Sequence, residues 1–112
     1  MGNSRLTNAH YEGQPAVRLD LGSSQTMQSA EDLHIALMEV AERALPLVIE
    51  ASSIERLSTV SVQLLLAAQR TLADRGSSLV VRRPSEAFLA AFRDLGIAPD
   101  DEGMILSEGA DG

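Results

Sequence analysis

The chain has 112 residues, which suits one compact domain, and 45% of them are hydrophobic but only 3% aromatic, so we expect an aliphatic core. It contains no cysteine, which excludes disulfides, thiolate metal sites and cysteine nucleophiles and agrees with a reducing compartment. The net charge of −7, with nine arginines and no lysine, argues against nucleic-acid binding, which needs clustered cations.

The opening segment predicts two strands. Residues 4–13 can form an edge strand, and residues 12–15 have the composition of a turn. Over residues 16–21 apolar and polar side chains alternate, which is typical of a strand with one buried face. The apolar side chains of this strand are Val17, Leu19 and Leu21.

The next segments predict a loop, a helix and a buried strand. Residues 22–28 are small and polar and indicate a loop. Residues 29–45 have an apolar stripe at helical spacing, with Ser29 as a favourable N-cap and Pro46 as the end signal. The apolar run at 45–51 is typical of a strand covered on both faces.

The following segments predict two more helices around another buried strand. A long helix is expected from about residue 59 to 75, closed by Gly76. Residues 77–83 predict the strand, and residues 84–96 predict the last helix, with Ser85 as its N-cap.

Strands that alternate with helices indicate an α/β fold. The predicted order is strand, strand, helix, strand, helix, strand, helix, which implies a four- to five-stranded mixed sheet with helices packed on it. We expect one domain over residues 1–112, with its core over about 15–98 and an acidic, partly mobile tail at 99–112. Within that tail, residues 104–106 can add a short strand.

The helix expected over residues 59–75 carries two apolar stripes. The stripe expected to face the core consists of Val62, Leu65, Leu66, Leu72 and Ala73. The second stripe consists of Val60, Leu64, Ala67 and Ala68. A helix on a sheet needs only one stripe, so the second either packs against the neighbouring helix or forms an exposed patch that suits a protein partner.

The sequence offers no arrangement that predicts catalysis or metal binding. His10 and His34 lie far apart, and no histidine pair has metal-ligand spacing. There is no glycine-rich phosphate loop and no nucleophile motif. We therefore expect a protein that is not an enzyme and that needs no cofactor or metal.

Nothing in the sequence predicts a membrane segment or an export signal. A spanning helix needs about 20 consecutive apolar residues, and no run of the chain approaches that length. Residues 1–16 lack the apolar core of a signal peptide. We therefore expect a cytoplasmic protein without direct membrane insertion.

Three hydroxyl residues lie where a strand leads into the long helix: Ser58, Thr59 and Ser61. Helix capping is one interpretation, since the oxygen of Ser58 or Thr59 can accept from a free amide of the first turn. Capping requires only one of the three. A phosphorylation switch is the other interpretation, because a phosphate here would meet the positive end of the helix dipole and add about two negative charges.

The ordered segments resemble the STAS domain family, which is named for sulphate transporters and anti-sigma factor antagonists. Family members have Asp-Ser-Ser-Gly-Leu or Asp-Thr-Ala-Gly-Leu before a helix that contains Leu-Leu, then Arg-Gly, a strand, Pro-Ser, and a last helix that ends in Leu-Gly-Ile. Here the segments SAEDLHIALMEV and 45–97 carry this pattern, and the likeness covers roughly residues 15–98. The resemblance implies a STAS fold in a stand-alone small protein.

The family motif can be placed residue by residue on this chain. The Asp falls on Ser58, the first Ser or Thr on Thr59, the phosphorylated serine of anti-sigma antagonists on Val60, and the Gly on Ser61. Val60 has no hydroxyl, so the usual acceptor is absent. The resemblance leaves Thr59, Ser58 and Ser61 as phosphorylation candidates.

The resemblance implies a non-enzymatic, protein-binding module that acts by partner switching, like a bacterial anti-sigma factor antagonist. Its partner would be a serine-kinase-type anti-sigma factor or another signalling kinase, and phosphorylation of Thr59 would weaken docking. The expected partner-binding residues are Ser58, Thr59, Val60, Ser61, Gln63 and Leu64.

Two alternatives use the same surface. Some small STAS proteins with Asp-Thr-Ala-Gly loops bind the ATPase of lipid-trafficking ABC transporters, and the chain also resembles these. A STAS regulator that works beside a chemotaxis histidine kinase is the other alternative.

Overall fold

A five-stranded mixed sheet forms the centre of the computed structural model, which describes residues 6–108. The spatial order of its strands is β1-β2-β4-β6-β7, in which β1 is antiparallel to β2 and all other neighbours are parallel. The strands are β1 (Leu6–Tyr11), β2 (Gln14–Asp20), β4 (Leu47–Glu50), β6 (Leu79–Arg82) and β7 (Ile105–Ser107). The predicted α/β class and mixed sheet are confirmed, with five strands.

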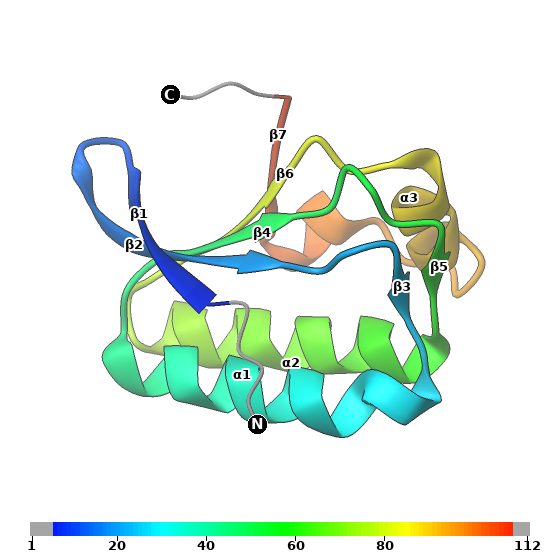
Figure 1. Cartoon of the computed structure of the whole chain (residues 1–112). Helices are drawn as coiled ribbons and strands as arrows, with labels where there is room; N and C mark the ends of the chain where they lie inside the picture. The colour runs from blue at the N-terminus through cyan, green and yellow to red at the C-terminus, as the bar shows by residue number, and fades with distance from the viewer. Residues whose placement is uncertain (1–5, 109–112) are drawn as a thin grey trace.

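Helices cover one face of this sheet. The helices α1 (Ala30–Arg43) and α2 (Thr59–Asp74) lie side by side beneath the strands in Figure 1, and α3 (Glu86–Arg93) lies at one end of the molecule, near the start of α2. No helix of the described residues covers the opposite face of the sheet (Figure 1). The strand that we expected to be covered on both faces, β4, is fully buried as predicted, and side chains of its neighbours cover the face that carries no helix.

The loop expected over residues 22–28 is more ordered than its composition indicates. It contains β3 (Ser24–Gln25) and a 3₁₀ helix, η1 (Met27–Ser29). β3 pairs in parallel with β5 (Arg56–Leu57), which comes directly before α2. Two-residue strands leave no readable period in the sequence, because their pairing depends on a partner more than 30 residues away.

The segment expected to be a tail instead completes the sheet. Residues Pro99–Glu102 form a 3₁₀ helix, η2, and β7 then pairs in parallel with β6. Pro99 and Met104 are buried, so this segment belongs to the core. The short strand expected at 104–106 is therefore present, one residue later. The last residues, for which we expected mobility, lie outside the described range.

The core side of α2 follows helical spacing closely. Leu65 is fully buried, and the same face contains Ala68, Gln69 and Leu72, three, four and seven residues further on. Ala73 was expected on this stripe and is exposed instead, because it lies in the last turn of α2, which ends at Asp74. The other core residues expected on α2, Val62, Leu65, Leu66 and Leu72, are all buried.

Replacing Leu65 with alanine tests this core. Leu65→Ala should lower the free energy of unfolding by about 2–5 kcal/mol, since the side chain is fully buried and the cavity would close only in part. Chemical denaturation measures the loss. Leu64→Ala is the matched control, because Leu64 is only half-buried and should cost clearly less. A loss below about 1 kcal/mol for Leu65→Ala would mean that the stripe containing Leu65 does not face the core.

Gly103 tests the packing of the C-terminal segment on α2. Its φ is +98°, and a Cβ at this position would lie 2.5 Å from Nε2 of the buried Gln69. Gly103→Ala should therefore destabilise the fold through both backbone strain and a clash, by roughly 2–4 kcal/mol. Gly13 has a φ of +83° with no atom within 4 Å of its added Cβ, so Gly13→Ala isolates the backbone contribution. If Gly103→Ala and Gly13→Ala lose the same stability in thermal unfolding, the proposed clash with Gln69 is wrong.

Candidate functional site

The start of α2 is built around Ser58. This residue is the N-cap, with extended backbone angles, and its Oγ accepts a hydrogen bond from the Ser61 amide at 3.1 Å. Its own amide donates to the carbonyl of Gln25 in β3 at 2.8 Å. The cap expected at Ser58 or Thr59 is thus formed by Ser58. The β3–β5 pair fixes where the helix begins.

Ser61 lies inside the protein. Its side chain is fully buried, and its Oγ is 2.9 Å from the Oγ of Ser58, so the two hydroxyls form a hydrogen-bonded pair. A buried hydroxyl in such a pair satisfies a polar group that would otherwise destabilise the core. This geometry gives Ser58 and Ser61 structural roles and does not expose the Ser61 oxygen to an enzyme.

Thr59 differs from both serines. It is the first residue of α2 and is exposed, and its side chain makes no hydrogen bond to another described residue. Gln63, one turn further on, is also exposed, while Val60 and Leu64 are half-buried. The first two turns of α2 thus bring five of the six predicted partner-binding residues to at least partial exposure, and Ser61 alone stays inside.

The loop that precedes α2 is held at both ends. Ser85 caps α3 by accepting from the Phe88 amide, and its Oγ donates to the carbonyl of Ile54 at 2.8 Å. The amide of Ser85 donates to the carbonyl of Ala51. These bonds tie residues 51–54 to the start of α3, while β3 ties residues 56–58. The surface around Thr59 is therefore presented by a fixed backbone.

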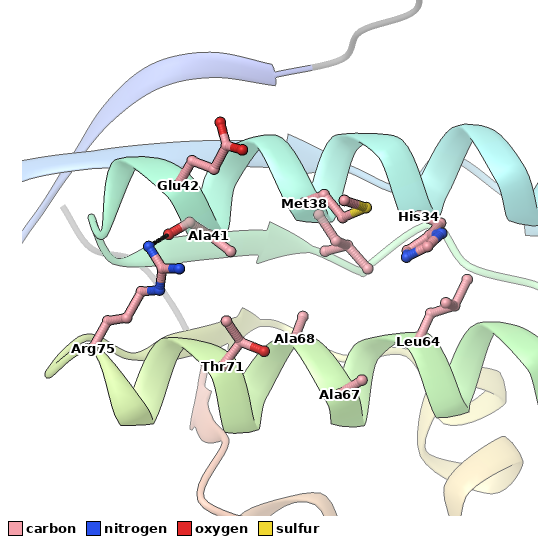
Figure 2. A pocket seen from close by; sticks show the side chains of 10 residues that line it. His34, Met38, Ala41, Glu42, Leu64, Ala67, Ala68, Thr71 and Arg75 are labelled. Carbon is pink, nitrogen blue, oxygen red and sulfur yellow. Dashed lines mark hydrogen bonds between the residues drawn. The ribbon is translucent and has the colours of Figure 1, made fainter.

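A groove runs between α1 and α2 and was only partly foreseen in the sequence (Figure 2). The second apolar stripe of α2, through Leu64, Ala67 and Ala68, lines one side, and α1 lines the other with residues that include Met38, which is 54% exposed. Arg75 closes one end by donating from Nη1 to the Ala41 carbonyl at 3.1 Å (Figure 2). Both interpretations of the second stripe thus apply, since it faces the neighbouring helix and stays partly open.

The described residues offer no metal centre. No group of three or more His, Cys, Asp or Glu side chains within residues 6–108 could hold an ion. Burial, with a smaller contribution from Glu12, raises the pKa of Tyr11. The hydrogen bond and charge of Glu86 raise the pKa of Arg93. Neither group belongs to the hydroxyl cluster, so neither would change the charge at the start of α2.

Comparison with known families agrees with this five-stranded sheet and its three helices. The family model described as Mlab, STAS domain, matches residues 9–106. The chain belongs to this STAS domain family. STAS domains are typically non-catalytic regulatory modules that bind proteins. The match extends past the resemblance noted at roughly 15–98, because it includes β1 from residue 9 and most of β7.

No curated protein matches the sequence. Among the helices of residues 6–108, none combines the length and the hydrophobicity that crossing a bilayer would require.

Ser58 can be tested separately from Thr59. Ser58→Ala should lower the free energy of unfolding by about 1–3 kcal/mol, because it removes the cap and leaves the buried Ser61 hydroxyl without its partner. Ser58→Asp should stay within about 0.5 kcal/mol of wild type, since a carboxylate also caps well and can accept from Ser61. Chemical denaturation of the two variants decides. A loss below about 0.5 kcal/mol for Ser58→Ala would show that the cap and the hydroxyl pair do not stabilise the helix start.

Proposed function

We propose that this STAS domain is a non-enzymatic docking module that switches between protein partners, in the manner of an anti-sigma factor antagonist. The docking surface is the start of α2, and Thr59 is its control point. The observation that carries the proposal is the exposure of Thr59 on the first turn of a helix whose neighbouring hydroxyls are both engaged. As in the sequence prediction, the whole chain acts as one domain in the cytoplasm.

The chemical character of this surface supports docking. Thr59 and Gln63 supply exposed polar groups, and Val60 and Leu64 supply half-buried apolar atoms that a partner could cover. Hydrogen bonds from Ser58 and Ser85 hold the backbone beneath them. A surface that is already ordered loses little conformational entropy when a partner binds.

Phosphorylation of Thr59 would change this surface without unfolding it. The side chain is at the first helical position, where a phosphate is favoured by the free amides and by the helix dipole. The added charge of about −2 would face a partner that otherwise meets a neutral hydroxyl. We therefore place the switch at Thr59, because Ser61 is buried and the Ser58 oxygen is used by the cap.

A second function is favoured by one feature of the motif. Val60 has no hydroxyl at the position of the usual phosphoserine, whereas Thr59 is retained. That combination resembles the Asp-Thr-Ala pattern of STAS proteins that serve lipid-trafficking ABC transporters. In this alternative the same surface docks a transporter ATPase, and Thr59 is a contact residue.

The test is affinity capture from the native cell extract with tagged wild type and Thr59→Glu, read by mass spectrometry. We expect wild type to recover a kinase-type anti-sigma factor, and Thr59→Glu to lose it. Ala73→Glu is the control, because it adds the same charge at an exposed site about 21 Å along the helix. Recovery of a transporter ATPase or a chemotaxis kinase would move the function to that alternative. If Thr59→Glu captures the same partner as well as wild type does, the start of α2 is not the docking surface.

A further inference from the structure

A cluster of arginines lies on the face of the sheet that the helices leave uncovered. Along β4 and β6, Ile49 and Val81 face the helices, so Glu50 and Arg82 face the other side, together with Val48 and Val80. Arg18 of β2 lies on this second face as well. The charged side chains thus gather toward the carboxyl ends of the three central parallel strands, on the face opposite the one that packs on α1 and α2.

Glu50 is the centre of this cluster. Its side chain is only 9% exposed, and three guanidinium groups surround its carboxylate: Arg83 at 3.4 Å, Arg82 at 3.7 Å and Arg18 at 3.8 Å. The Ser52 hydroxyl also donates to it, at 3.1 Å. The contacting atoms are Nη2 of Arg18, Nη2 of Arg83 and Nε of Arg82, and the three arginine side chains remain 26–54% exposed.

One carboxylate cannot satisfy three guanidinium groups. Each guanidinium has five N–H donors. Arg83 donates a hydrogen bond to Glu50 at 3.4 Å, whereas the contacts of Arg18 and Arg82 to this carboxylate are longer than hydrogen bonds. The Nε atoms of Arg18 and Arg82 are shielded from solvent and, like Oε1 of Glu50, have no hydrogen-bond partner in the described structure. Asp20 lies on the same face and has contacts of its own. The three arginines therefore carry one more positive charge than Glu50 and Asp20 together neutralise.

The backbone of Arg83 adds independent evidence. Side chains alternate along a strand, so the residue after Arg82 would face the helices. Arg83 instead has a φ of 47°, a left-handed conformation that is unfavourable for a side chain of this size. This conformation leaves two consecutive arginines in contact with the same carboxylate. Strain of this kind is found preferentially at ligand-binding sites.

We propose that Arg18, Arg82 and Arg83 form a binding site for an oxyanion, a carboxylate or phosphate group, on the uncovered face of the sheet. Glu50 is a positioning residue that holds the three guanidinium groups together, and the ligand takes the donors that Glu50 leaves unused. Guanidinium groups suit this ligand because their paired N–H donors match two oxygens of a carboxylate or phosphate. The site does not involve Thr59 and is independent of the partner surface proposed above.

The first experiment is a ¹H–¹⁵N NMR titration of the whole chain with inorganic phosphate, with sodium chloride at matched ionic strength as the reference. We expect saturable shifts at the amides of Arg18, Arg82 and Arg83 with phosphate only. Arg83→Asn should weaken phosphate binding about tenfold, since it removes a charged donor. Asparagine tolerates the left-handed backbone, so this variant should fold. Arg43→Gln, on the outer side of α1, should leave the affinity unchanged.

A second titration identifies the source of the oxyanion. It uses a hexapeptide of glutamate in place of phosphate, against wild type and Arg83→Asn. Tighter binding of the peptide at the same amides would assign the site to acidic side chains of a protein, and tighter binding of phosphate would assign it to a free or covalently held phosphate. Shifts that chloride reproduces, that spread over the whole surface, or that Arg83→Asn leaves unchanged would overturn the proposal.

Discussion

The packing of α1 and α2 on one face of the parallel strands is the constraint on which the rest of the structure, including the candidate site, depends. With 3% aromatic residues, the chain must build this layer from aliphatic side chains, and Leu47, Ile49, Leu65 and Leu79 are all fully excluded from solvent. Because β2, β4 and β6 are parallel, their carboxyl ends lie at the same edge of the sheet. The loops that begin α1, α2 and α3 therefore meet at that edge, where the candidate site lies.

The loops at this edge hold one another in place through main-chain and serine contacts. Gln25 binds the amide of Ser58, and Ser85 binds the carbonyl of Ile54. Each contact joins segments that are separated by about 30 residues in the chain. Their effect is that the first turn of α2 is ordered before any partner arrives. In the function that we propose, a single charge added at Thr59 would act on this fixed surface.

The two faces of the sheet differ in the side chains that they carry. On the covered face, β2, β4 and β6 present buried apolar side chains, which contribute the hydrophobic stabilisation. The uncovered face has a row of small apolar residues, Ala16, Val48 and Val80, and beyond it the cluster around Glu50. A buried carboxylate is tolerated only where cations compensate it. Three arginines around one carboxylate exceed that requirement, in a chain that is acidic overall.

The sequence by itself determined the α/β class, the long helices and the central strands, because their periods and caps are local; Ser58, Ser85 and the apolar stripe of Leu65 were all readable. The family resemblance also followed from ordered local motifs. Only the tertiary structure decided which hydroxyl is exposed at the start of α2, that Pro99 and Met104 belong to the core, and that three arginines converge on Glu50. These features depend on contacts between segments far apart in the chain, which no local pattern of residues encodes.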